Sequence, residues 1–257
     1  MIKIVAIALT TFRESVRSKV LYSVLFFAVV MVLVSALFGT VTIGDQVRVI
    51  KDFGLMSVSL FPVAFAVIAG TSLLSKELAK KTIYNILAKP VRRSEFLWGK
   101  YFGMLATTIV MALAMGAGLS AFAWVLEGRI DDALFVGYAF SIMELIVVCA
   151  AAIFFSSIVV TPLLSGLFTF GVFLAGRSAE YVLFFIKEKS VNGPLATFLR
   201  GLYAVLPHLD LMNFSNALVY GKYPPFDYAL FCLLYAMGYA GVLLILAGMI
   251  FSRREFN

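Results

Sequence analysis

Long apolar segments recur along this sequence, and they constrain its fold more than any other feature. About 20 helical residues are needed to cross the ~30 Å hydrocarbon core of a bilayer, and six runs of roughly this length are present. Inside a bilayer the backbone polar groups must bind one another, so only helices and closed barrels can span it. None of the runs alternates apolar and polar residues as a barrel strand does. The sequence therefore predicts an all-α integral membrane protein.

The composition agrees with this fold class and excludes several others. Hydrophobic residues make up 62% of the chain, against roughly 45–50% in soluble domains. The two cysteines, Cys149 and Cys232, lie inside apolar runs, where they are expected to be small buried side chains and not a disulfide or metal pair. The net charge of +7 comes from basic residues scattered among the runs. This placement indicates membrane topology and no nucleic-acid partner.

Residues 1–19 form a separate unit that is predicted to be an interfacial amphipathic helix. Its apolar face would consist of Ile2, Val5, Leu9, Phe12 and Val16, and its polar face of Thr10, Arg13, Glu14 and Arg17. The alternative is a signal peptide cleaved near Val34-Ser35-Ala36. The apolar run from Val20 to Phe38 is longer than the ~7–15 residue core of a signal peptide, which favours the interfacial helix.

The predicted spans are residues 20–38, 53–74, 101–126, 136–160, 163 to about 185, and 228–251. Six spans place both termini on one side, and the side rich in Lys and Arg is expected to be cytoplasmic. With the N-terminus inside, the inner face carries 13 of the 21 lysines and arginines. Both termini are therefore predicted to be cytoplasmic, and residues 1–257 form a single transmembrane domain.

Two connections between the spans have distinctive sequences. The fourth and fifth spans are separated by little more than Thr161-Pro162, which predicts a tight hairpin. Residues 187–224 form an apolar stretch interrupted by Arg200 and ended by Pro207, followed by an amphipathic piece over 209–220. We expect this segment to be re-entrant or interfacial at the outer surface, with two short helices and no seventh span.

The most charged stretch of the chain is the connection between the second and third spans, residues 75–103. Residues 77–88 contain no helix breaker, and Pro90 ends a helix there. A short helix across the cytoplasmic face is therefore expected, followed by a new helix from about Arg92. Composition alone is equally typical of a solvated basic loop that only sets topology.

The order of residues in this connection resembles the cytoplasmic loop of permease subunits in the type-2 ABC exporter family. Glu77 follows a span, Thr82 and a Leu/Ile pair come next, and Pro90 precedes a basic pair. The resemblance extends to an N-terminal elbow helix, six spans, an irregular outer segment and a basic C-terminal tail. One departure is Lys81, which occupies the position where the family usually has Gly before the Thr, so the local backbone shape differs.

This resemblance implies that residues 76–93 contain a coupling helix that docks into a separate ATPase subunit. The residues assigned to ATPase coupling are Glu77, Lys80, Lys81, Thr82, Tyr84, Asn85, Leu87, Pro90, Arg92 and Arg93. It also implies two copies of the ATPase, carrying ATP and Mg, and a second copy of this permease or a related one. The expected location is the inner membrane of a prokaryote, and an extracytoplasmic accessory protein is a further candidate partner.

The chain lacks a nucleotide-binding motif of its own. A P-loop needs Gly-Lys followed by Ser or Thr, whereas Gly99-Lys100 and Gly221-Lys222 are each followed by Tyr. The single histidine, His208, falls short of a metal site. We therefore expect no cofactor, metal or catalytic residue on this chain, with ATP hydrolysis on the partner.

Three charged residues lie in or near predicted spans. Glu144 is about seven residues from the outer end of the fourth span, roughly 10 Å deep at 1.5 Å per residue. A buried acid must face protein or a cavity, so Glu144 either lines a translocation path or pairs structurally with a cation or a neighbouring helix. Arg177 and Glu180 can pair along one helix face near the end of the fifth span.

Transport is the leading interpretation, and three alternatives remain open. An intramembrane enzyme would use Glu144 and His208, but these lie on different segments without a completing residue. A secondary transporter would usually show an internal repeat. A membrane scaffold coupled to an ABC ATPase, acting on an extracytoplasmic partner, would share the sequence features of an exporter.

Overall fold

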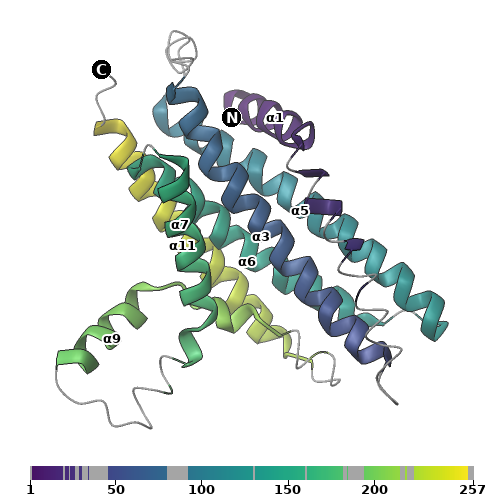
Figure 1. Ribbon diagram of the computed structural model, residues 1–257. Helices are drawn as coiled ribbons and strands as arrows, with labels where there is room; N and C mark the ends of the chain where they lie inside the picture. Colours follow the sequence, from purple (N-terminus) through teal and green to yellow (C-terminus); the bar gives the residue numbers. More distant parts are fainter. Residues whose placement is uncertain are drawn as a thin grey trace.

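The computed structural model describes residues 2–19, 46–79, 92–129, 131–159, 161–181, 194–214 and 223–253, with isolated residues between them (Figure 1). The elements are α1 (Ile2–Val16), α3 (Gln46–Ala79), α5 (Arg93–Glu127), α6 (Asp132–Ile158), α7 (Pro162–Arg177), α9 (Pro194–Val205), the short 3-10 helix η1 (Leu209–Met212) and α11 (Phe226–Arg253). These described residues contain no strand, which confirms the all-α class.

Four helices are long and apolar enough to cross a membrane: α3, α5, α6 and α11. They correspond to the second, third, fourth and sixth predicted spans. The fifth was expected to reach about residue 185, but α7 has 16 residues and ends at Arg177, which gives about 24 Å at 1.5 Å per residue. The first predicted span, 20–38, lies mainly outside the described residues, so the total of six stays a prediction.

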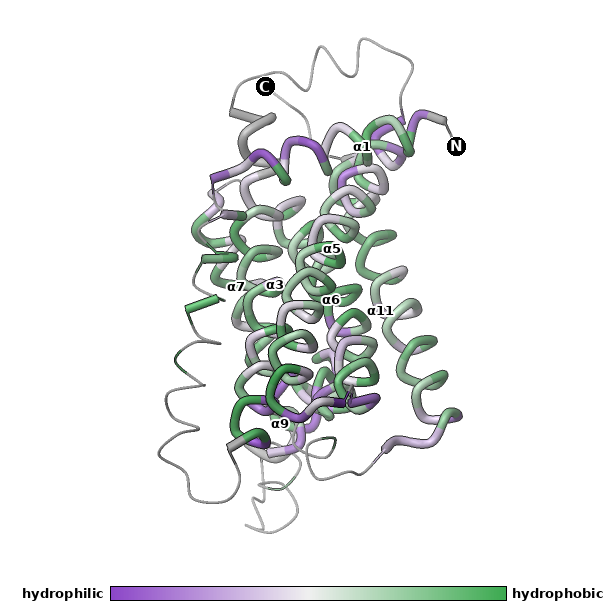
Figure 2. Tube along the Cα trace, turned by 90° about the vertical axis from the view of Figure 1, so that its right-hand side faces the viewer, coloured by the Kyte–Doolittle hydropathy of each residue, from purple (hydrophilic) through white to green (hydrophobic). Residues whose placement is uncertain are grey.

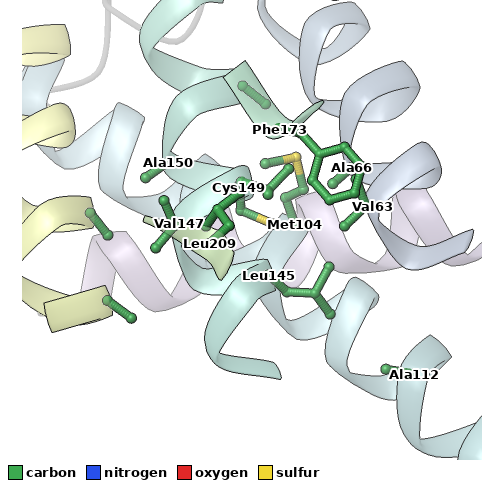
Figure 3. Close-up of a cluster of buried hydrophobic side chains, with 14 of the residues drawn as sticks. Val63, Ala66, Met104, Ala112, Leu145, Val147, Cys149, Ala150, Phe173 and Leu209 are labelled. Atoms are coloured by element: carbon green, nitrogen blue, oxygen red, sulfur yellow. The ribbon is translucent and has the colours of Figure 1, made fainter. Parts of the chain in front are cut away.

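Helix α6 is the centre of the bundle. It packs against α3, α5, α7 and α11, and apart from Glu144 and three serines its buried residues are almost all apolar, as expected for a helix enclosed by others. Figure 3 shows part of this core, in which Leu145, Val147, Cys149 and Ala150 of α6 lie among side chains from α3, α5 and α7. Leu209 of η1 reaches the same cluster, so η1 contributes to the core.

The described helices place α1 and α9 at opposite ends of the bundle. α1 lies across one end and packs on the start of α5, and the last turns of α3 and α11 are at the same end, while α9 lies at the opposite end (Figures 1 and 2). The first helix and the end of the last helix therefore share one end, as an even number of crossings requires. That this end faces the cytoplasm remains a prediction from the basic residues.

Helices α6 and α7 form the predicted tight hairpin. α6 ends at Ile158 and α7 begins at Pro162, a first position that suits proline because its missing N–H would be unpaired there in any case. Close to the turn, the hydroxyl oxygens of Ser156 and Ser165 are 3.1 Å apart. The two helices are thus antiparallel neighbours.

The described part of the segment 187–224 consists of residues 194–214 and contains α9 and η1. α9 is a short helix at the end of the bundle, but the predicted amphipathic piece over 209–220 begins as a 3-10 turn that ends at Met212. Leu209 and Met212 are buried, and η1 packs on α6 and α7. The segment around η1 therefore re-enters the bundle.

Candidate functional site

A buried carboxylate lies near the middle of the bundle. Glu144 is 12 residues after the start of α6 and 14 before its end, deeper than the sequence-based estimate because α6 begins at Asp132. Its side chain is 2% exposed. Ser59, at the middle of α3, donates a hydrogen bond of 2.5 Å to Oε2 of Glu144. The acid thus faces protein and not lipid, as its desolvation cost requires.

A cation completes this arrangement. Nη1 of Arg177, the last residue of α7, lies 3.8 Å from Oε1 of Glu144 and donates a hydrogen bond of 3.1 Å to Oγ of Ser59. Its Nη2 donates to Oδ1 of Asn213 at 3.0 Å. We call these four residues, Ser59, Glu144, Arg177 and Asn213, the Glu144 network. It joins α3, α6, α7 and the residue that follows η1.

This geometry corrects the expected partner of Arg177. The sequence allowed a pair with Glu180 along one helix, but α7 ends at Arg177, and the exposed Glu180 forms none of the ion pairs recorded for the described residues. Of the two interpretations of Glu144, the geometry matches an acid paired with a cation. Removing one member of a buried pair leaves an uncompensated charge, so the network holds its three helices in register.

The re-entrant segment touches the same turn of α7. A Cβ at Gly176 would overlap the carbonyl oxygen of Pro207 and crowd the side chain of Leu209. Only glycine permits this approach, which brings Asn213 within reach of Arg177. The end of α7 therefore anchors the segment around η1 through one close backbone contact and one hydrogen bond.

Most of the residues assigned to ATPase coupling lie outside the described part of the chain: Lys80, Lys81, Thr82, Tyr84, Asn85, Leu87 and Pro90. The backbone of Glu77 belongs to the last turn of α3, which continues to Ala79. The expected separate helix over 77–88 therefore starts within α3, and its remainder stays a prediction.

Arg92 and Arg93 are described, and both stabilise the start of α5. The backbone N–H of Arg92 donates a 2.9 Å hydrogen bond to Oε2 of Glu95, as in the second half of a capping box. Nη1 of Arg93 donates to the carbonyl oxygens of Phe251 (3.2 Å) and Ser252 (2.9 Å) in the last turn of α11. A cation at the C-terminal end of a helix is favoured by the helix dipole. Arg93 thus ties the start of α5 to α11.

Gly99 and Gly103, for which no packing role was predicted from the sequence, bring α1 onto the same part of α5. A Cβ at Gly99 would lie 2.6 Å from the Cβ of Ile7, and one at Gly103 would lie 2.5 Å from the carbonyl oxygen of Ala8. Their four-residue spacing, the small-xxx-small pattern of close helix pairs, was the signal available in the sequence. The first three turns of α5 therefore hold both α1 and α11.

An ion cluster joins the helices at the end where α9 lies. Nζ of Lys51 is 2.8 Å from Oε1 of Glu127 and 2.6 Å from Oδ2 of Asp131. Burial raises the pKa of Asp131, but hydrogen bonds from Lys51 and the Ala133 amide and the nearby positive charges outweigh it, so the net pKa is lowered. The cluster fixes the start of α3 to the α5–α6 connection.

These features define a polytopic helical membrane protein with a buried polar network and a re-entrant segment. The family model of the ABC-2 family transporter proteins matches residues 5–256, so the chain belongs to this family. No curated protein matches the chain. The family assignment confirms the resemblance to type-2 ABC permeases: the chain is a membrane component of an ABC transport system and not itself an enzyme.

Proposed function

We propose that this chain is the permease subunit of an ABC exporter, driven by a separate ATPase that docks at the end of the bundle where α1 lies. The observation that carries the proposal is the family match over residues 5–256. In support, residues 80–91, which contain most of the assigned coupling positions, join the ends of α3 and α5 at this end. ATP and Mg would bind to the partner ATPase.

The contacts of α5 suggest how movement would spread from the docked ATPase. Residues 80–91 lead directly into α5, whose first turns hold α11 through Arg93 and α1 through Gly99 and Gly103. A displacement of the connection would therefore move α1, α5 and the end of α11 together. The hydrogen bonds and the ion pair of the Glu144 network likewise hold α3, α6 and α7 together, so that these helices would also move as a group. Relative movement of these two groups of helices is the mechanical basis of the proposal.

The assembly follows from the same proposal. Two copies of this permease, or one copy and a related permease, would enclose the path and bind two ATPase subunits. The membrane would be the inner membrane of a prokaryote, with the α1 end in the cytoplasm. An extracytoplasmic accessory protein would meet the opposite end, where α9 lies.

Two substitutions, one in the connection and one in the last turn of α3, test the coupling role. Leu87→Asp should weaken co-purification with the ATPase, because a charge would be left in an apolar contact, and Glu77→Ala should lower transport-stimulated ATP hydrolysis. Leu202→Asp on α9, at the other end of the bundle, and the exposed Glu180→Ala are matched controls. Unchanged binding and hydrolysis in Leu87→Asp and Glu77→Ala would return the connection to a solvated loop that only sets topology.

Labelling tests the orientation independently. In a chain without other accessible cysteines, Asn85→Cys should resist an impermeant thiol reagent in intact cells and react after the cells are opened. Asp45→Cys should react in both conditions. Labelling of Asn85→Cys in intact cells would overturn the proposed docking side.

A further inference from the structure

An apolar groove of about 550 Å³ lies between α1 and α5. Its lining comes from residues 4–12 of α1 and 102–110 of α5, and every lining side chain is apolar. Small residues, Ala8, Gly103 and Ala106, lie between larger ones such as Phe12 and Phe102. The volume falls within the range of roughly 300–1,000 Å³ that is typical of ligand sites.

Water is a poor occupant for this groove. A cavity holds ordered water only where polar groups can bind it, and this lining offers none. The side chains along its edges are also exposed: the exposed fraction is 55% for Val5, 50% for Leu9, 44% for Phe102 and 50% for Val110. The occupant must therefore be apolar and must arrive from outside the bundle.

The position and length of the groove match one leaflet of a bilayer. It begins at Phe102, next to the predicted start of the third span at residue 101, and extends to Val110. Eight residues of helix correspond to about 12 Å, close to half of the ~30 Å hydrocarbon core. The groove therefore runs from the membrane boundary, where α1 lies, toward the bilayer centre.

The charge beside the groove is positive. Arg13 follows Leu9 by four residues and so lies one helical turn further along α1, at the boundary between its apolar and polar faces. Its side chain is exposed. Basic residues beside an apolar face are the pattern by which interfacial helices hold anionic lipid.

We propose that this groove binds one acyl chain of an anionic phospholipid, whose headgroup phosphate is held by Arg13. The lipid would fill the space between α1 and α5 beside the close contacts at Gly99 and Gly103. The proposal concerns a lipid site and is independent of ATPase pairing and of transport direction.

Photocrosslinking tests the occupant. The chain carrying p-benzoylphenylalanine in place of Leu9 would be reconstituted in vesicles of phosphatidylglycerol and phosphatidylcholine, and its adducts identified by mass. We expect phosphatidylglycerol adducts enriched about fivefold over the bulk ratio, as ~1 kcal/mol per basic residue near an anionic lipid gives. The same probe in place of Ile245, an exposed residue of α11 outside the groove, should give adducts in the bulk ratio.

Two variants separate the charge from the groove. Arg13→Gln should return the adducts at position 9 to the bulk ratio, while Ala106→Phe, at an exposed groove position, should lower their total yield by filling the space. Both should keep the wild-type elution volume in gel filtration. A crosslink from position 9 to a second copy of the chain would overturn the proposal, as would adducts in the bulk ratio in the otherwise unmodified chain.

Discussion

Glu144 and Arg177 lie opposite each other because they are almost equally far from the turn between α6 and α7. Glu144 is 14 residues before Ile158, the last residue of α6, and Arg177 is 15 residues after Pro162, the first of α7. Ser156 and Ser165, with hydroxyls 3.1 Å apart, hold the equivalent positions near the turn. The short connection therefore sets the level at which the acid and the cation meet.

Removing the cation should destabilise the bundle. Arg177→Met would leave Glu144 buried without a compensating charge, which costs about 3–5 kcal/mol in buried pairs. The double variant Glu144→Gln/Arg177→Met should recover part of this loss, because neither charge would then remain. Equilibrium unfolding in mixed detergent micelles measures the free energy of unfolding of the single and the double variant.

Glu180→Gln is the control for this experiment, since its side chain is exposed and lies just beyond the helix. A surface change of this kind is expected to alter stability by less than ~0.5 kcal/mol. Equal losses for Arg177→Met and Glu180→Gln would mean that the network contributes nothing to the fold.

The Lys51 cluster should make the stability of the folded chain depend on pH. Because the pKa of Asp131 is lowered in the folded chain from its ordinary value of 3.8, its contribution is complete above that value and is lost as the pH falls through the folded pKa. Asp131→Asn keeps a side-chain acceptor for the Ala133 amide but removes the charge. The variant should be less stable than the wild type at pH 6, and the two melting temperatures should converge as the pH falls below about 4. A difference that stays constant between pH 6 and pH 3 would contradict the assignment.

The contact between α1 and α5 should tolerate no side chain at Gly103. Gly103→Ala would place a Cβ 2.5 Å from the carbonyl oxygen of Ala8, and overpacking of this kind costs about 1–3 kcal/mol. Gly118→Ala on the same helix meets nothing within 4 Å and should be neutral or gain up to ~1 kcal/mol from helix propensity. Hydrogen exchange of the α1 amides should accelerate only in Gly103→Ala. Similar exchange in the two variants would show that α1 is held by other contacts.

The sequence predicted the parts of the fold that depend on local pattern. The apolar runs located four helices that can cross a membrane, and Thr161-Pro162 located the hairpin. With that hairpin in place, the level of Arg177 beside Glu144 follows from counting residues. The pair of Glu144 and Arg177 was not predicted, because the fifth span was expected to extend to about residue 185, whereas α7 ends at Arg177.

Contacts between distant segments could not be predicted in this way. Arg93 meets α11 through carbonyl groups 158 and 159 residues further along the chain, and Asn213 reaches Arg177 only because η1 re-enters the bundle. Both depend on how helices pack around α6, which no local periodicity specifies. Gly99 and Gly103 are the exception, since their spacing is a recognisable signal of close packing.

Docking of the re-entrant segment should depend on Gly176. A methyl group there would overlap the carbonyl oxygen of Pro207, a backbone atom that cannot rotate aside, so Gly176→Ala should displace the segment from α7. Displacement would also break the hydrogen bond from Arg177 to Asn213, which is 3.0 Å long. Gly171→Ala, on the same helix with nothing within 4 Å, is the matched control.

Hydrogen exchange followed by mass spectrometry shows whether the segment around η1 leaves α7 or stays in place. In Gly176→Ala the amides of residues 206–213 should exchange at least about tenfold faster, which corresponds to a loss of ~1.4 kcal/mol in local stability. The α6 amides near Glu144 should change little, because Ser59 still donates a hydrogen bond to Glu144. Gly171→Ala should match the wild type in both regions. If residues 206–213 keep their protection in Gly176→Ala, the segment is held by Leu209 and Met212 in the core, and the end of α7 is not its anchor.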